Sequence, residues 1–455
     1  MSRHSLTIAG RVVLIATTVA GLLWWHHSRH TQTSGTWNPP PQTVLSSMRT
    51  LPAVGWRISA VDVGLPPDTA FVTAPNVGQS KPLVGYLDNK AYFLASRPQG
   101  HGWWLVGVDV RSGQALFPPV SLASDTVYRP DCYLNGPTSV LCLRLDGTAS
   151  VAWVIEATTG VVTFRGPTSL TQNPGNNGVD QVGIYAIASK AGQGVSGVGD
   201  HAERTWFVGG HGDIDQRYRA QSDLGDPTIG TQGIGGPATV RKVVFSLADG
   251  KVLSPDLGSG RQTLDAVVYP GGFAMEGGPS GPLADSEEVL FYDTRGQQIG
   301  RAETTGTLAT RSHDVPTIVT SGGAMVYTPS GAPVVRVSSD GAEPDTVLIG
   351  TRLMVNTGGG SSFPEWTQYD LRTGKQGPTC EANFGNYLGT DGTVAVLRIL
   401  DPARGRVATA VDLATCQRLW TLQAGIDSQA QVWRINTTLV QLSDEGTELM
   451  SLVAP

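Results

Sequence analysis

Short apolar runs recur along the chain from residue 83 onward, and Gly, Pro, Asn or Asp separates each run from the next. The runs either alternate apolar with polar positions or are apolar throughout, and no long stretch of the body shows the 3.6-residue apolar period of a helix. This pattern predicts short antiparallel strands joined by tight turns. The clearest runs lie at residues 83–86, 91–95, 104–108, 151–155, 266–269, 289–292 and 394–397.

A turn motif recurs at the ends of these strands, where an acidic or small polar residue is followed by a Gly, typically as D-x-x-T-G. The Asp or Glu side chain can accept hydrogen bonds from backbone N–H groups just ahead of it. The Gly supplies the positive φ that a tight hairpin needs. The turns begin at Asp109, Glu156, Ser246, Asp293, Asp370 and Asp412, and the turn glycines include Gly113, Gly160, Gly250 and Gly374.

The spacing of these turns predicts a β-propeller. Successive turns are 47, 90, 47, 77 and 42 residues apart, and a hairpin every 40–50 residues is about the period of a propeller blade. Six turns and a closing blade give seven blades. The two longer gaps, 160–246 and 296–370, each have room for a degenerate blade, so we expect seven or eight.

The repeat resembles that of the PQQ-like (quinoprotein-like) β-propellers, in which a strand, a D-x-x-T-G turn and a strand that sometimes carries Trp follow one another. The best copy runs from Asp412 to Trp420, with Cys416 in place of the Gly, and the copy at Asp293 is one residue shorter. As a period, the resemblance covers most of residues 80–455, and it implies eight blades.

The resemblance raises the question of a PQQ site. Quinoprotein dehydrogenases use an adjacent Cys-Cys pair and a calcium site of Glu, Asn and Asp, and this chain has no adjacent cysteines. The stretch from His211 to Asp215 holds two carboxylates but too few oxygen ligands for a calcium loop of EF-hand type. No G-x-S-x-G or P-loop occurs. We therefore expect no catalytic, cofactor or metal site.

The two ends of the body predict how the ring closes. The chain from 432 to 455 resembles a blade that stops before its last strand, and the residues around Trp56 resemble the strand that follows the turn in other copies. We expect residues 56–63 to complete the last blade, which would remove two exposed sheet edges.

All four cysteines lie in the body. Cys132 and Cys142 flank the turn signal at 135–137, which predicts that they face each other across a hairpin. Cys380 follows the outer strand of one blade and Cys416 lies in the turn of the next, which favours an inter-blade disulfide. The alternative for Cys132 and Cys142 is a pair of buried free thiols. Disulfides would indicate an oxidising compartment.

Residues 6–25 have the length that crosses about 30 Å of hydrocarbon, with Arg11 near enough to the end to reach the headgroups. The uninterrupted run 12–25 could instead be the apolar region of a signal peptide. We favour an uncleaved single-pass anchor, after a cytoplasmic tail at 1–5. A Pro-rich tether at 26–53 would then lead to an extracytoplasmic propeller at 54–455.

The composition limits the classes of function that the chain can have. Charged residues make up 15% of the chain, hydrophobic residues make up 40%, and the net charge is −6. The absence of a basic cluster in the body argues against a nucleic-acid partner. We expect a non-enzymatic scaffold of the bacterial cell envelope that binds the membrane and other envelope proteins. The alternatives are a ligand-binding or sensory ectodomain that uses the propeller funnel, and a PQQ-dependent or other rim-site enzyme.

Overall fold

The structure is a computed structural model of the chain, and the part that it describes is all-β apart from one short 3-10 helix, η2 (Phe384–Asn386). In this part, no helix is long and apolar enough to cross a membrane, and the anchor expected at 6–25 lies outside it. The described residues are 35–71, 82–98, 102–123, 129–146, 149–172, 178–214, 223–235, 241–255, 257–279, 288–303, 306–338, 343–356, 365–401, 405–425 and 428–455.

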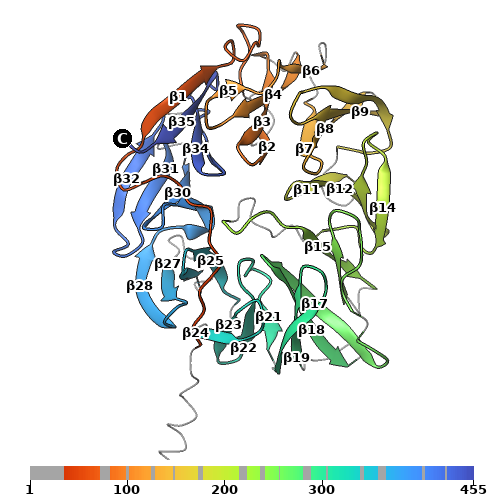
Figure 1. Cartoon of the computed structure of the whole chain (residues 1–455), viewed down its shortest axis with the longest axis vertical. Coiled ribbons are helices and arrows are strands. Elements are labelled where there is room, and N and C mark those ends of the chain that lie inside the picture. The colour runs from red at the N-terminus through yellow and green to blue at the C-terminus, as the bar shows by residue number, and fades with distance from the viewer. Residues whose placement is uncertain are drawn as a thin grey trace, which may run out of the picture.

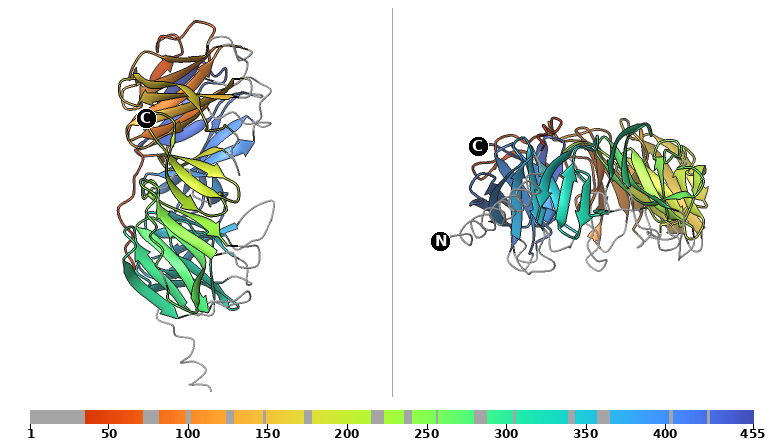
Figure 2. Two further views of the ribbon diagram at one scale, coloured as in Figure 1. Left: turned by 90° about the vertical axis from the view of Figure 1, so that its right-hand side faces the viewer. Right: turned by 90° about the horizontal axis from the view of Figure 1, so that it is seen from below.

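The strands form a flat ring of radially arranged antiparallel sheets (Figures 1 and 2). The described residues make eight sheets of four or five strands, here called full blades, and one two-stranded sheet. The predicted all-β propeller is therefore confirmed. Of the two expected blade numbers, eight is the number of full blades.

The first half of the ring contains three full blades and the two-stranded sheet. Their strands are β2 (Leu83–Leu87), β3 (Lys90–Ser96), β4 (Trp103–Asp109), β5 (Gln114–Ala115) and β6 (Val120–Ala123); β7 (Asp131–Leu134), β8 (Ser139–Asp146), β9 (Ala149–Glu156) and β10 (Val162–Thr168); β11 (Val179–Val182), β12 (Tyr185–Lys190), β13 (Gly194–Val198) and β14 (Arg204–Gly209); and β15 (Ile229–Ile234) and β16 (Arg241–Ser246).

Five full blades complete the ring. Their strands are β17 (Arg261–Tyr269), β18 (Gly272–Pro279), β19 (Glu288–Asp293) and β20 (Gln298–Glu303); β21 (Thr307–Leu308), β22 (Thr317–Thr320), β23 (Gly323–Tyr327) and β24 (Pro333–Val337); β25 (Asp345–Ile349), β26 (Arg352–Asn356), β27 (Glu365–Asp370) and β28 (Lys375–Glu381); β29 (Tyr387–Thr390), β30 (Val394–Asp401), β31 (Arg406–Asp412) and β32 (Arg418–Gln423); and β33 (Val432–Ile435), β34 (Thr438–Leu442), β35 (Glu448–Val453) and β1 (Ala53–Ser59).

The two-stranded sheet is a reduced blade. Isolated bridges flank its two strands, with Ile214 against Gln232 of β15 and Val252 against Phe245 of β16. The positions of a first and a fourth strand are thus occupied by single bridging residues. The predicted turn at Ser246 and Gly250 belongs to this reduced blade. The two longer gaps between predicted turns, 160–246 and 296–370, hold the full blades β11–β14 and β21–β24.

The ring closes between the two ends of the propeller. The strand expected over residues 56–63 runs from Ala53 to Ser59, and β1 pairs antiparallel with β35, with Ile58 opposite Leu449. The last blade therefore takes its outermost strand from the start of the chain. This arrangement satisfies the edges that an open ring would expose.

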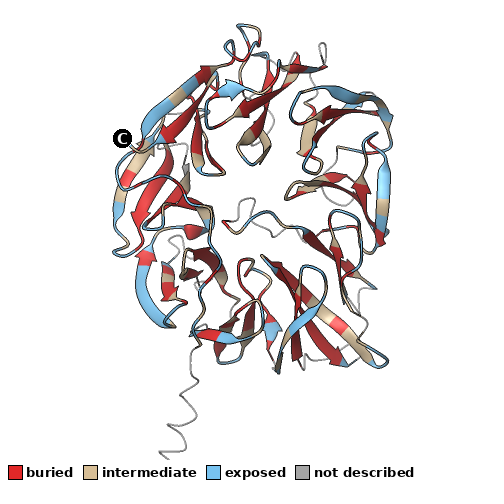
Figure 3. Ribbon diagram, viewed as in Figure 1, coloured by how far each residue is buried: buried red, intermediate tan, exposed pale blue. Residues whose placement is uncertain are grey.

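The core lies between neighbouring blades. Middle strands such as β3 and β19 are buried, whereas outer strands such as β14 and β28 are largely exposed (Figure 3). At the closing joint, the ring of Phe93 on β3 meets that of Trp433 on β33 edge to face, with centroids 5.9 Å apart. Strands that are covered on both faces need apolar residues at successive positions, which explains the continuous apolar runs in the sequence.

Candidate functional site

The predicted turn residues form hairpin turns in separate blades and do not converge on one site. The backbone N–H of Arg111 donates to the Asp109 carboxylate at 2.8 Å, and that of Arg372 donates to Asp370 at 2.8 Å. Glu156 accepts in the same way from Thr159 at 2.6 Å. These hydrogen bonds hold the turns closed, so the motif is structural.

The glycines of these turns have left-handed backbones, as expected. Their φ values are 72° at Gly113, 71° at Gly160, 69° at Gly250 and 67° at Gly374, and Cys416 has 61° at the equivalent position. Only Gly adopts this conformation without steric cost.

An aromatic ring from the preceding blade packs on several of these glycines. A Cβ at Gly113 would lie 2.6 Å from the Trp56 ring, and one at Gly250 would lie 2.6 Å from the Trp206 ring. The Trp56 Nε1–H also donates to the Val110 carbonyl at 2.7 Å. The Trp in the repeat therefore joins one blade to the next, a role that is invisible from within a single repeat.

Both predicted disulfides are present. Cys132 and Cys142 are opposite each other on β7 and β8, with their Cα atoms 4.0 Å apart. Cys380 on β28 is bonded to Cys416 in the turn after β31, with a Cα separation of 5.1 Å, and so links two blades. Cys416 adopts the left-handed backbone that a Gly adopts in the other turns, and in this turn its side chain forms the covalent link between two blades.

Residues 35–52, here called the N-terminal strap, run across one face of the ring before β1 begins (Figure 1). The strap lies within the segment that the sequence predicts as a Pro-rich tether, 26–53, and it contacts the ring. Backbone N–H groups of the strap donate to carbonyls of two blades, from Trp37 to Leu371 at 2.8 Å and from Leu45 to Thr390 at 2.7 Å. Consecutive prolines cannot join a sheet, but they can lie extended against one.

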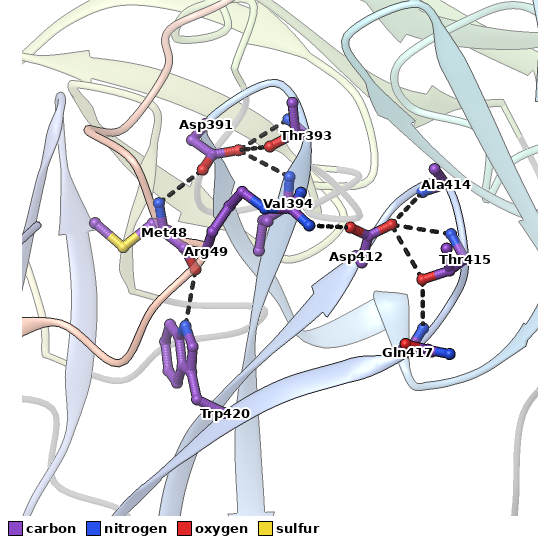
Figure 4. A network of polar contacts seen from close by, with 10 residues as sticks. All are labelled: Met48, Arg49, Asp391, Thr393, Val394, Asp412, Ala414, Thr415, Gln417 and Trp420. Carbon is purple, nitrogen blue, oxygen red and sulfur yellow. Dashed lines mark hydrogen bonds and ion pairs between the residues drawn. The ribbon is translucent and has the colours of Figure 1, made fainter.

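The strap ends in a polar latch on the β29–β32 blade (Figure 4). The Met48 N–H donates to Asp391 Oδ2 at 2.6 Å, and the Met48 carbonyl accepts from Trp420 Nε1 at 2.8 Å. Arg49 forms an ion pair with Asp412 at 2.9 Å. The Met48 side chain is fully buried, so its apolar surface adds to the latch.

The latch stabilises two carboxylates in their charged form. Burial alone would raise the pKa of Asp391, but hydrogen bonds from the backbone of Met48, Thr393 and Val394 outweigh burial and lower it. The pKa of Asp412 is lowered in the same way, by backbone N–H groups and Arg49 acting against burial.

A cavity of about 560 Å³ lies at the centre of the ring. Its walls come from the innermost strands β2, β7 and β33, the residues around β29, and residues 223–228, here called the central segment. The central segment precedes β15 and reaches into the middle of the ring (Figure 1). It belongs to the connection between the first two positions of the reduced blade.

A buried ion pair fixes the central segment. Asp223 pairs with Arg434 of β33, and the Tyr387 hydroxyl donates to the same carboxylate. The side chains of Asp223 and Arg434 are only 2% and 1% exposed. The Asp223 carbonyl also accepts from the N–H of Thr43 in the strap, at 2.9 Å. The strap, the central segment and the last blade thus form one connected unit.

The cavity wall carries more positive than negative side chains. Arg129, Arg398 and Asp226 all line it. Burial raises the pKa of Asp226, and the nearby Asp88 raises it further. Burial lowers the pKa of Arg129, which Asp131 partly offsets.

Among the described residues, no group of three or more His, Cys, Asp or Glu side chains could hold a metal ion. His211 hydrogen-bonds through Nε2 to the Gly235 carbonyl at 2.7 Å, and Asp215 lies outside the described part. Polar residues in the innermost strands are the sequence signal that could have indicated the cavity. Arg434, which stands within an otherwise apolar run, is an example.

Known proteins that are similar to this chain include one sequence relative and two solved structures. A protein described as uncharacterized, from Mycolicibacterium smegmatis (strain MKD8), is 38% identical over 437 residues, which cover 92% of this chain and 89% of that protein. The crystal structure of BamB from Moraxella catarrhalis is 11% identical, with a TM-score of 0.38, over 88% of this chain and 97% of that one. The computationally designed Ika8 protein is 14% identical, with a TM-score of 0.36, over 90% and 100%.

At these TM-scores the two solved structures carry no argument about this chain. A family model, in contrast, matches residues 29–455. That span includes every described blade, and the nine blades in the family's description equal the eight full blades and the reduced blade. The chain belongs to the family of the conjugation-associated 9-bladed β-propeller domain.

Proposed function

We propose that the protein is a membrane-anchored, non-enzymatic scaffold of the cell envelope that binds other proteins during conjugation. The observation that carries the proposal is the match of residues 29–455 to a conjugation-associated propeller family. A ring of blades offers two broad faces built from turns and loops, where binding sites commonly lie. Fold alone does not identify the partner, so the proposal extends only to the class of function.

The anchor is the second part of the proposal. Residues 6–25 would span the membrane, and the two disulfides favour an oxidising compartment for the propeller. The strap contacts the ring from Gly35 onward, where a Cβ would lie 2.3 Å from the Pro333 carbonyl. Only residues 26–34 then separate the span from the ring, and nine residues reach about 30 Å at most. The ring would therefore be held close to the bilayer.

A conjugation assay tests the scaffold. Deleting the gene from a conjugating host should lower the frequency of DNA transfer, and the full chain should restore it. A chain without residues 6–25 should fail, whereas one with an unrelated transmembrane helix in their place should succeed. Unchanged transfer in the deletion strain would refute the link to conjugation.

A separate measurement tests the proposed location and orientation of the protein. The protein should fractionate with membranes, and protease added outside spheroplasts should digest the propeller. A propeller that is protected from external protease in intact spheroplasts, and digested only after lysis, would overturn the proposed orientation.

A further inference from the structure

Arg398 is an unusual residue of the central cavity wall. It projects from β30, lines the cavity, and makes one hydrogen bond, from Nη2 to the Val432 carbonyl at 3.3 Å. Its Nε is buried and has no hydrogen-bond partner. A guanidinium carries five donor hydrogens, so most of its hydrogen-bonding capacity is unused within the part of the chain that the structure describes.

Nothing nearby in the described residues balances the charge of Arg398. No described carboxylate lies within ion-pair distance of it, and burial is the one cause that shifts its pKa, downward. Of the other charges of the wall, Arg129 lies beside Asp131, whereas Asp226 lies near Tyr86 and the like-charged Asp88. An arginine removed from bulk water without an anionic partner costs stability.

We propose that the central cavity binds a small anion, a carboxylate or a phosphate, through Arg398. The guanidinium fork matches both groups, with two parallel N–H donors for two oxygens. The amide side chains of Asn386 and Gln431 line the same cavity and can add neutral hydrogen bonds. A volume of about 560 Å³ is in the range of small-molecule sites. This inference does not depend on the proposed role in conjugation.

The cavity also explains why the site would be selective for a compact ligand. The pair of Asp223 and Arg434 fixes the central segment against the walls, so the cavity is shaped before a ligand arrives. A pre-formed cavity binds with little ordering cost.

Calorimetric titration of the full chain in detergent tests the proposal, with inorganic phosphate in one arm and succinate in the other. We expect binding in at least one arm, which also tells phosphate from carboxylate. Arg398→Gln should weaken it about tenfold or more, because a charge-assisted bidentate contact is lost. Arg336→Gln is the matched control, since Arg336 is exposed and also donates one hydrogen bond to a backbone carbonyl, that of Gly322, at 2.9 Å. This control should bind like the wild type.

A melting experiment separates ligand binding from a structural role. Without anion, Arg398→Met should melt at or above the wild-type temperature, because it removes a half-buried charge that has no acidic partner. The anion should raise the melting temperature of the wild type and not that of this variant. Absence of binding in both arms, or an Arg398→Gln variant that binds as tightly as the wild type, would overturn the proposal. So would an Arg398→Met variant that keeps the anion-induced rise.

Discussion

The joint that closes the ring can be tested at Gly113. Gly113→Ala places a methyl group 2.6 Å from the Trp56 ring, which is closer than packed atoms approach. Trp56 belongs to β1 in the last blade, whereas Gly113 lies in the turn of the first full blade. The substitution should therefore push apart the two blades at which the ring closes.

The cost has two parts. An alanine at φ 72° costs about 1–2 kcal/mol whatever surrounds it. Displacing Trp56 adds the loss of its hydrogen bond to Val110, about 1 kcal/mol, and of part of its packing, about 1–2 kcal/mol. We expect Gly113→Ala to lower the free energy of unfolding by about 3–5 kcal/mol.

Gly136→Ala is the matched control. Gly136 has φ 79° but nothing within 4 Å of an added Cβ, so only the backbone cost of about 1–2 kcal/mol should appear. Urea unfolding followed by circular dichroism measures both variants. In a Trp56→Ala background, Gly113→Ala should cost no more than Gly136→Ala. If the two glycine variants lose equal stability in the wild-type background, the ring-on-glycine contact contributes nothing and the reasoning fails.

Three further outcomes follow from buried groups and cross-links. Burial raises the pKa of Glu276 from 4.5 to about 7, so the contribution of its protonated form to stability is full below pH 4.5 and is lost as the pH rises through 7. Unfolding measured from pH 5 to 8 should therefore show a free energy that falls by at most about 3 kcal/mol because of this group, and Glu276→Gln should remove that fall. Replacing Cys380 and Cys416 by Ser removes a link with a sequence separation of 36 and should cost about 4 kcal/mol, and reductant should lower the melting temperature of the variant less than that of the wild type, because only the Cys132–Cys142 disulfide is left to reduce. Asp391→Ala removes the acceptor of the Met48 N–H, so limited proteolysis should cut the strap faster than in the wild type, and equal rates would show that the latch is not needed.

The fold could be predicted because the interactions that define each repeat are made between residues that are close in sequence. The acidic residue and the Gly of each turn act within a few residues of each other, as at Asp109 and Gly113, and the middle strands need apolar runs. The disulfides could be predicted too, because Cys132 and Cys142 are placed symmetrically about a turn.

The central cavity could not be predicted, because its residues come from many blades. Asp223 and Arg434 are 211 positions apart, and nothing in either neighbourhood indicates the other. Two full blades, β11–β14 and β21–β24, gave no turn signal. Their third strands end in Val198 and Tyr327 and not in an acidic or small polar residue, so the motif does not mark them.

The strap shows how composition can mislead about packing. A Pro-rich segment reads as a spacer because proline lacks the N–H that a sheet needs. The residues that bind this segment to the ring are its scattered apolar members, above all Leu45 and Met48, which are 5% and 0% exposed. Such isolated apolar residues have no period, so a pattern search passes over them.

The order of contacts along the N-terminus has a mechanical consequence for the proposed anchor. Tension from the membrane would enter the ring at Gly35 and meet the hydrogen bonds of Trp37, Thr43 and Met48 before it reached β1. The closing pair of β1 and β35 would stay unloaded until those contacts had broken in turn. A ring that is closed by its own N-terminal strand and tethered through the same terminus needs such protection, because otherwise a pull on the anchor would act directly on the strand that closes it. The strap therefore supplies a physical reason why one chain could combine the proposed membrane tether with a closed propeller.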